Sequence, residues 1–225
     1  MKYQNVTTGT FLSRPNRFIA YVEVDGETVI SHVKNTGRCK ELLVSGTKVV
    51  LAESDNPERR TRFDLISVYK GDRLINMDSQ VPNEVVAESL PSLDLVPGLK
   101  GIRREVGYGN SRFDILAEGD RPTFIEVKGV TLEDDGIVMF PDAPTERGVK
   151  HLRELMSAHQ DGYDTIVFFL IQMDDVKYFT PNRKTHREFA EALREASEAG
   201  VRVVAYDSVV TEDSIIIGDR VTTVL

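Results

Sequence analysis

Two carboxylates and one ammonium group stand close together in the middle of the chain, where Asp114, Glu126 and Lys128 follow the spacing D-x11-E-x-K. Both segments that carry them are short, apolar and predicted to be strands. Since side chains alternate along a strand, Glu126 and Lys128 share one face. If Ala117 pairs with Thr123 across the intervening turn, the register places Asp114 directly opposite Glu126.

Adjacent carboxylates repel one another unless a positive charge lies between them, and a divalent metal ion supplies that charge. Oxygen ligands with open positions favour Mg²⁺ or Mn²⁺, which lowers the pKa of a bound water and stabilises a leaving oxygen. Lys128 would orient the attacking water or offset charge on a phosphate. Glu105, just before the first strand, is the candidate third acid. The sequence thus predicts catalytic residues Glu105, Asp114, Glu126 and Lys128, with Asp114 and Glu126 as metal ligands.

Two other interpretations of these residues stay open. The pattern is loose, and a surface hairpin with a Glu–Lys ion pair would also produce it. Lys128 would also neutralise the two carboxylates by itself, without a metal ion. The neighbouring apolar residues favour a site, because one face of the sheet is expected to pack while the other does chemistry. The residues assigned to the packed face are Phe113, Ile115, Ile125 and Val127.

A helix predicted over residues 146–160 brings further cations towards this region. Arg147, Lys150 and His151 stand at i, i+3 and i+4, so they share one helix face near the N-terminus. Thr145 is suited to cap that terminus, and backbone N–H groups there favour a phosphate. The three residues are therefore predicted to bind nucleic acid, and an ordinary solvated helix face is the alternative.

The elements that position these groups belong to a mixed α/β domain, expected over residues 83–225. Strands are predicted at 112–117, 123–128, 165–172 and 201–206, with a second helix at 187–199. The helix between the two later strands provides a crossover, which favours a parallel pair. Two weak strand-like runs, 214–217 and 221–225, follow without readable partners.

Residues 1–82 are expected to form a separate domain of short strands. Candidate strands at 10–13, 18–24, 28–33, 47–52, 62–69 and 74–77 suggest a small barrel, of which the OB fold is the commonest design; another small β-sheet is the alternative. Asp25-Gly26 and Lys70-Gly71-Asp72 are hairpin turns. The fold class is thus α/β with a small β-barrel.

Charge is distributed unevenly between the two parts. The chain carries −8, but residues 1–80 hold 12 Lys and Arg against 10 Asp and Glu, while residues 81–225 hold 16 against 26. The first domain is therefore expected to supply DNA affinity, with Phe11, Phe18 and Tyr21 as stacking or core residues. The cations predicted to bind nucleic acid there are Arg14, Arg17, Lys34, Arg38, Arg59, Arg60 and Arg62. His32, Asn35, Thr36 and Arg38 form a group that contacts an anion or braces the domain interface.

Several classes of protein are disfavoured. The N-terminus has no apolar secretory segment, and no apolar run approaches the roughly 20 residues of a membrane span. Cys39 is the one cysteine, so neither an intramolecular disulfide nor a zinc site of clustered cysteines can form. A cytoplasmic protein is expected.

The chain resembles the sugar fermentation stimulation protein A family in several separated blocks. They are HVKNTGR at 32–38, ELL at 41–43, RRTRFDL at 59–65, PN at 82–83, REVGYGNSRFD at 104–114, EVKGVTL at 126–132 and the run 140–155. The resemblance implies an N-terminal OB-like domain and a C-terminal PD-(D/E)xK nuclease-like (restriction-endonuclease-like) α/β domain. It also implies DNA binding and a regulatory role in sugar, notably maltose, metabolism. By position it assigns Asp114, Glu126 and Lys128 to the nuclease-fold motif, with Glu105 as the additional acid. His186 stands where the family usually has an acidic residue.

Three functions follow. The first is a DNA-binding regulator with a nuclease-like metal site, and the second is an active Mg²⁺-dependent nuclease or other nucleic-acid-processing enzyme. The third, a sugar-binding module, has little support, because the chain has no Trp and sugar sites usually rely on aromatic stacking.

Overall fold

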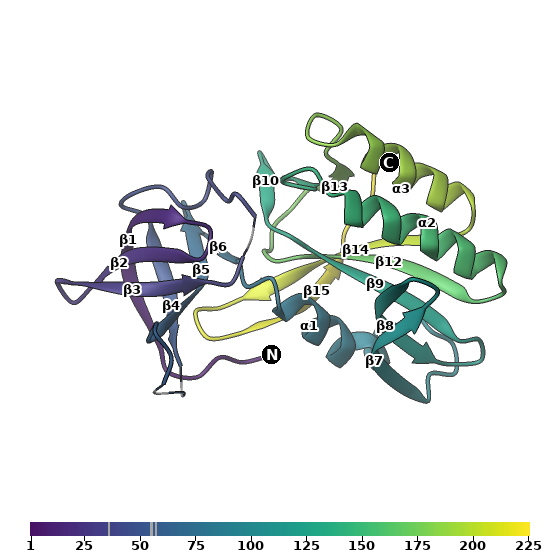
Figure 1. Ribbon diagram of the computed structural model, residues 1–225, viewed down its shortest axis with the longest axis horizontal. Helices are drawn as coiled ribbons and strands as arrows, with labels where there is room; N and C mark the ends of the chain where they lie inside the picture. Colours follow the sequence, from purple (N-terminus) through teal and green to yellow (C-terminus); the bar gives the residue numbers. More distant parts are fainter. Residues whose placement is uncertain (36, 55, 57) are drawn as a thin grey trace.

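The computed structural model describes residues 1–35, 37–54, 56 and 58–225. Thr36, which the sequence groups with His32, Asn35 and Arg38, lies outside the described residues. In Figure 1 a β-barrel at one end of an elongated molecule joins a larger α/β body at the other. The fold class expected from the sequence, an OB-like barrel followed by a mixed α/β domain, is confirmed.

The barrel is built from short strands, of which β4 and β5 are the most completely buried. It contains β1 (Val6–Asn16), β2 (Ile19–Val24), β3 (Glu27–Val33), β4 (Lys48–Glu53), β5 (Phe63–Lys70) and β6 (Arg73–Asn76). The strand order is β3-β2-β1-β4-β5-β6, and a parallel pairing of β3 with β5 closes the barrel. The predicted hairpin at Asp25-Gly26 is confirmed, because both residues have the positive φ angles that a tight β2–β3 turn needs.

The second domain centres on a six-stranded sheet in the order β15-β14-β12-β9-β8-β7. These strands are β7 (Gly101–Tyr108), β8 (Ser111–Glu118), β9 (Thr123–Val130), β12 (Asp164–Ile171), β14 (Arg202–Val210) and β15 (Ile215–Arg220). β9, β12 and β14 run parallel, so the predicted parallel pair is confirmed. β15 pairs antiparallel with β14 and ends at Arg220, so residues 221–225 are not a strand.

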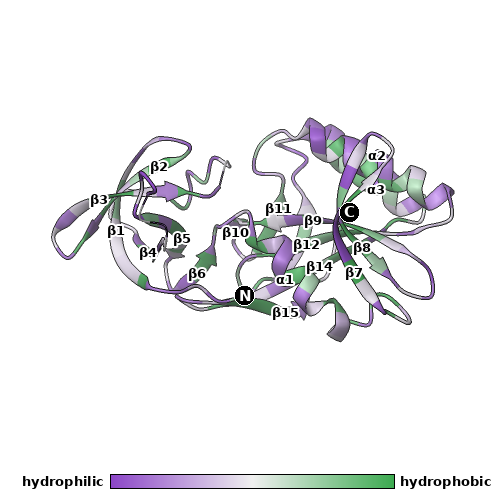
Figure 2. Cartoon of the chain, turned by 60° about the horizontal axis from the view of Figure 1, so that its bottom comes forward, coloured by the Kyte–Doolittle hydropathy of each residue, from purple (hydrophilic) through white to green (hydrophobic). Residues whose placement is uncertain are grey.

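Helices cover both faces of this sheet. Figure 1 shows α2 (Glu146–Gln160) and α3 (Arg187–Glu198) side by side over one face, with α1 (Val81–Ser89) on the other, followed by the short turn η1 (Leu90–Ser92). In Figure 2 hydrophilic and hydrophobic segments alternate along α2 and α3, as expected of amphipathic helices. Buried residues of α2 and α3 pack with Phe124 and Phe169, whereas those of α1 pack with Ile125 and Phe168.

The expectation of one packed and one chemical face was therefore wrong. Ile115, Ile125 and Val127 do pack together on the α1 side, but Phe113 packs with Phe124 on the side covered by α2. Both faces are buried because the crossover helices α2 and α3 cover one side, while α1, which precedes the sheet in the chain, covers the other. Any chemistry of Glu126 therefore takes place beneath α2.

A third, small sheet lies where the two domains meet. It orders β10 (Leu132–Asp134), β11 (Ile137–Phe140) and β13 (Tyr178–Pro181). Glu133 of β10 is buried and accepts ion pairs from Lys70 at 2.6 Å and Arg73 at 3.0 Å, both from the barrel's β5–β6 hairpin. This carboxylate ties the barrel to the α/β domain.

Candidate functional site

The β8–β9 hairpin brings the two candidate ligands together. Ala117 pairs with Thr123 and Ile115 with Ile125, which is the register that the turn length predicts. Asp114 lies beyond the last of these pairs, and its Oδ2 accepts a hydrogen bond from the backbone N–H of Val127 at 2.8 Å. Its other oxygen, Oδ1, accepts from Asn83 Nδ2 at 2.8 Å. A residue of α1 thus helps to hold the carboxylate that projects from β8.

Glu126 is the most enclosed member of the site, with 2% of its surface exposed. Lys128 Nζ and His151 Nδ1 both contact the same oxygen, Oε1. The second oxygen, Oε2, is buried and has no hydrogen-bond partner among the described residues. A buried carboxylate oxygen without a partner is energetically costly, so this atom is the natural place for a ligand's positive charge.

The pKa values of Asp114 and Glu126 are shifted in opposite directions. Burial first, and then the charge of Glu126, raises the pKa of Asp114, although the Val127 N–H, Lys128 and Asn83 oppose the shift. Burial would also raise the pKa of Glu126, but His151 and Lys128 outweigh it, so the pKa lies below its usual value. Glu126 is therefore ionised at neutral pH, while Asp114 holds its proton more readily than a free aspartate. A cation between the two carboxylates would offset both their burial and their mutual repulsion, because it favours the ionised form of each.

His151 occupies a different place from the one that the sequence suggests. It lies on α2 but is only 5% exposed and points to Glu126, so it does not lie on an open phosphate-binding face. Arg147 and Lys150 do lie exposed on this helix. Arg147 Nε donates to His151 Nε2 at 3.3 Å, and Lys150 Nζ donates to the Asn110 carbonyl at 3.2 Å. The i, i+4 spacing signals that Arg147 and His151 are neighbours, but which of them faces inward depends on tertiary packing.

Glu105 is placed at the surface of β7. Its carboxylate forms an ion pair with exposed Arg112 at 3.2 Å, and its backbone has a positive φ of 56°. The structure therefore brings Asp114, Glu126 and Lys128 together and leaves Glu105 paired elsewhere. Asn83 was missed because its contribution depends on how α1 packs against the sheet, which no local spacing reveals.

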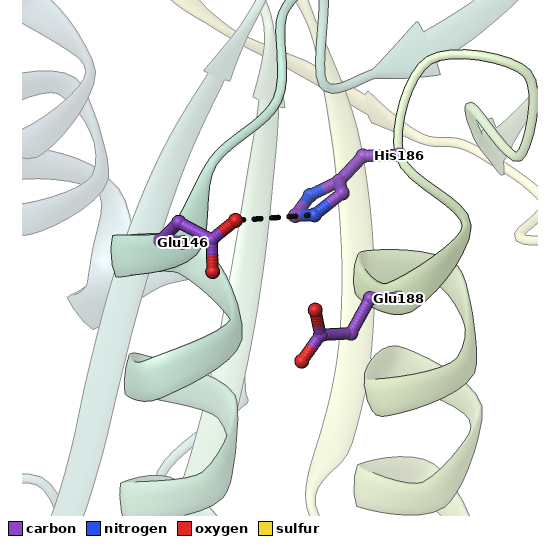
Figure 3. A group of neighbouring side chains, drawn as sticks. All are labelled: Glu146, His186 and Glu188. Carbon is purple, nitrogen blue, oxygen red and sulfur yellow. Dashed lines mark ion pairs between the residues drawn. The ribbon is translucent and has the colours of Figure 1, made fainter.

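A second acidic group lies at the N-termini of α2 and α3, where Figure 3 shows Glu146, His186 and Glu188. One ligand atom of each lies within 4.8 Å of the others. However, the backbone N–H of Thr145 donates to His186 Nδ1 at 3.2 Å, which places the ring proton on Nε2, the atom that faces Glu146. A protonated Nε2 offers no lone pair to a metal ion, so we interpret the group as a polar contact between two helix ends.

The cations of the barrel fall into two sets. Some are already engaged: Arg14 donates to four backbone carbonyls, those of Arg17, Asn35, Gly37 and Arg38. Lys34 and Arg59 both bind buried Asp64, and Arg62 binds Glu53 at 2.6 Å. Arg17, Arg38 and Arg60 lie exposed. The sequence could not separate the two sets, because their partners come from distant strands.

A pocket of about 640 Å³ opens beside the engaged Arg14. Four cations, Arg14, Arg17, Arg38 and Lys40, line it, and no Asp or Glu is among the described residues that do so. Phe11, which the sequence left open as a stacking or core residue, is 2% exposed and belongs to the core, whereas Phe18 is 44% exposed and lies 4.9 Å below the Arg17 guanidinium. The barrel thus presents a cationic pocket with an exposed aromatic ring nearby.

Comparisons with known proteins assign each of the two domains to a family model. A family model described as the SfsA N-terminal OB domain matches residues 12–77, and one described as the sugar fermentation stimulation protein RE domain matches residues 80–214. The protein is thus an OB barrel joined to an RE-type α/β domain. The chain belongs to the sugar fermentation stimulation protein family, as the sequence blocks indicated.

Close relatives extend over the whole chain. A sugar fermentation stimulation protein homolog of Desulfitobacterium hafniense (strain Y51) is 58% identical over 99% of this chain and 97% of its own. One of Clostridium beijerinckii is 56% identical over 100% of both chains. A solved structure, that of Pyrococcus furiosus SfsA in complex with Ca²⁺, aligns with a TM-score of 0.88 at 27% identity and covers 100% of this chain and 98% of that one. Within the described residues, no helix is long and apolar enough to cross a membrane.

Proposed function

We propose that this protein binds DNA through its barrel and holds one divalent metal ion, Mg²⁺ or Mn²⁺, at Asp114 and Glu126. The observation that carries the proposal is Glu126 Oε2, a buried carboxylate oxygen for which the described part of the chain supplies no partner, while both neighbouring donors occupy Oε1. The raised pKa of Asp114 supports it, because burial and then the charge of Glu126 outweigh the stabilisation that Lys128 and the hydrogen-bond donors give to this carboxylate.

The donor set fits a hard cation. Carboxylate oxygens are what Mg²⁺, Mn²⁺ and Ca²⁺ prefer, and one or two of them with retained waters suffice for Mg²⁺. A relative of known structure was solved in complex with Ca²⁺, which also prefers oxygen ligands. The alternative, in which Lys128 neutralises both acids by itself, accounts for its contact with Glu126 but leaves Oε2 unpaired.

Each residue around the metal ion would have a separate role. Asn83 and the Val127 N–H keep Asp114 aimed into the site. Lys128, 15% exposed at its side chain, would offset charge on a phosphate that reaches the site. A bound ion would contribute a Lewis acid and a more acidic water. With these groups the site is suited to phosphodiester hydrolysis.

The barrel is the proposed source of DNA affinity. Arg17, Arg38 and Lys40 are exposed cations around one pocket in a chain whose net charge is −8. A local basic surface holds a phosphate backbone even when the whole protein is acidic.

Two physiological roles are consistent with this arrangement. The first is a regulatory DNA-binding protein in sugar metabolism, a role in keeping with the name of the relatives. The second is an active nuclease, and the complete set of Asp114, Glu126 and Lys128 favours it. They differ in whether the phosphodiester bond breaks.

Incubation with plasmid and with single-stranded DNA, in Mg²⁺, Mn²⁺ or EDTA, tests both roles. Hydrolysis in Mg²⁺ or Mn²⁺ that Glu126→Ala abolishes supports the enzyme, whereas binding without cleavage supports the regulator. Glu118→Ala is the matched control, because this exposed carboxylate lies on β8, the strand next to that of Glu126, and pairs with Arg103. Titration calorimetry with Mn²⁺ then tests the ligands. Saturable binding lost in both Asp114→Ala and Glu126→Ala supports the metal site, and no binding at millimolar Mn²⁺ refutes it.

A further inference from the structure

Three residues form a chain of contacts from the surface of α2 to the buried acid. Arg147 is exposed, His151 is buried one helical turn further along, and Glu126 lies beneath them on β9. Arg147 Nε donates to His151 Nε2 at 3.3 Å, and His151 Nδ1 contacts Glu126 Oε1. The contact of His151 with Glu126 belongs to the site described above, whereas that of Arg147 with His151 has no role in it so far.

The direction of the first hydrogen bond decides the state of the ring. The Nε–H of an arginine can only donate, so His151 Nε2 must accept and cannot carry a proton. The remaining proton of a neutral imidazole then lies on Nδ1, and His151 donates it to Glu126. Arg147 thereby selects the tautomer of His151 in which the ring is a donor towards the acid.

The hydrogen bond from His151 to Oε1 fixes the orientation of the Glu126 carboxylate. With His151 and Lys128 both on Oε1, the carboxylate is held from two sides, and Oε2 is the oxygen that no described residue contacts by a hydrogen bond. A freely rotating glutamate would present either oxygen, whereas this one presents a single oxygen in one direction. Ligands of metal ions are commonly oriented in this way by groups that do not touch the ion.

We propose that His151 is a positioning residue for the metal site, and that Arg147 holds it in the tautomer that orients Glu126 Oε2 towards the ion. This inference rests on the proposed metal site. It assigns His151, which the sequence placed among the nucleic-acid contacts, to the geometry of that site.

Mn²⁺ affinity in the absence of DNA tests the proposal, since it avoids any contribution of Arg147 to phosphate binding. His151→Ala is expected to weaken Mn²⁺ binding by about 10–100-fold, as removal of such supporting groups typically does. His151→Asn keeps an amide N–H near the place of Nδ1 and is expected to restore most of the affinity. His151→Gln carries its amide at the place of Nε2 and is expected to remain weak. Arg147→Gln, at an exposed position, is expected to give a smaller loss.

His159→Ala is the matched control, because His159 lies two turns further along the same helix and contacts Gly200. It should bind Mn²⁺ like the wild-type protein. Long-range ¹⁵N–¹H spectra of the His rings provide a readout without metal, in which His151 should carry its proton on Nδ1 and lose that preference in Arg147→Gln.

The results distinguish the positioning role of His151 from the existence of the metal site. Equal Mn²⁺ affinity of His151→Asn and His151→Gln, wild-type affinity of folded His151→Ala, or an Nε2–H tautomer in the wild-type protein overturns the positioning role, while the metal site itself stands. Failure of the wild-type protein to bind Mn²⁺ is a separate result, because it refutes the proposed function before any variant is compared.

Discussion

The most direct test of the DNA-binding proposal removes the three exposed cations around the barrel pocket together. The variant is Arg17→Ala/Arg38→Ala/Lys40→Ala. Arg14 is left in place because its guanidinium holds four backbone carbonyls and its loss would disturb the loop. None of the three cations makes a side-chain ion pair with a described Asp or Glu, so each is free to meet a phosphate.

The expected effect follows from the number of phosphates that these cations would neutralise. Each phosphate contact contributes about 0.7 to the slope of log affinity against log salt for single strands, and about 0.9 for duplex DNA. Three contacts therefore contribute about 2 to 3 units of slope. Between 50 and 200 mM salt, the wild-type protein should lose about 20–40-fold more affinity than the variant.

Fluorescence anisotropy with a labelled oligonucleotide at four salt concentrations measures this slope. The control is Arg103→Ala/Arg187→Ala/Arg194→Ala, which removes the same charge from three exposed arginines that are each paired with a glutamate. The reasoning is refuted if the pocket variant keeps the wild-type slope, or if the control loses as much slope as the pocket variant does.

Three further predictions concern stability and reactivity. Glu133→Gln should lower the free energy of unfolding by about 2 kcal/mol and the melting temperature by about 4–8 °C in calorimetry. The loss is smaller than the about 3–5 kcal/mol expected for a fully buried pair, because Lys70 and Arg73 stay partly hydrated. An unchanged transition would show that this carboxylate does not hold the domains together. The pKa of Asp64 is depressed because Arg59 and Lys34 outweigh its burial, so the ionised carboxylate stabilises the fold above the usual aspartate pKa, and this contribution disappears as pH falls through the pKa of the folded state. Between pH 7 and pH 2 the melting temperature should therefore fall more steeply in the wild-type protein than in Asp64→Asn. Parallel curves of melting temperature against pH would contradict this. Burial first, and then Asp142 and Glu41, raises the pKa of the Cys39 thiol to about 12, so a thiol reagent at pH 8 should label it only after unfolding, whereas rapid labelling of the native protein would contradict its enclosure.

Local pattern predicted a substantial part of this molecule. The pairing of Ala117 with Thr123 follows from the turn length, and it fixes where Asp114 and Glu126 meet. The helix over 146–160 and its Thr145 cap, which accepts from the Gly148 N–H at 3.0 Å, follow from periodicity and residue type. These features depend on neighbours in sequence, which is why the chain alone reveals them.

The rest depends on packing between distant segments. Nothing near His151 indicates that it faces a strand 25 residues earlier, and nothing near Arg59 shows that Asp64 also receives Lys34. Barrel closure by β3 and β5, and the burial of the sheet on both faces, are likewise properties of the assembled fold. Charge and spacing predict which groups can do chemistry, whereas tertiary contacts decide which of them are already satisfied.

The two proposed binding regions are joined by one short path through the domain interface. The backbone N–H of Arg38, at the pocket, donates to Asp142 Oδ2 at 3.1 Å, and Asp142 lies between β11 and α2. Gly37 permits this approach, because a Cβ there would collide with the Asp142 carboxylate.

A buried amide network reinforces the same interface. Gln172 Nε2 donates to Asn76 Oδ1 at 2.8 Å and to the Asp78 carbonyl at 3.0 Å, both from the end of the barrel. Satisfied buried networks of this kind hold a single arrangement, so the barrel and the α/β domain are expected to move as one body. DNA held by Arg38 would then lie at a fixed offset from Glu126, and the segment that fixes the offset leads directly into α2, the helix that carries Arg147 and His151.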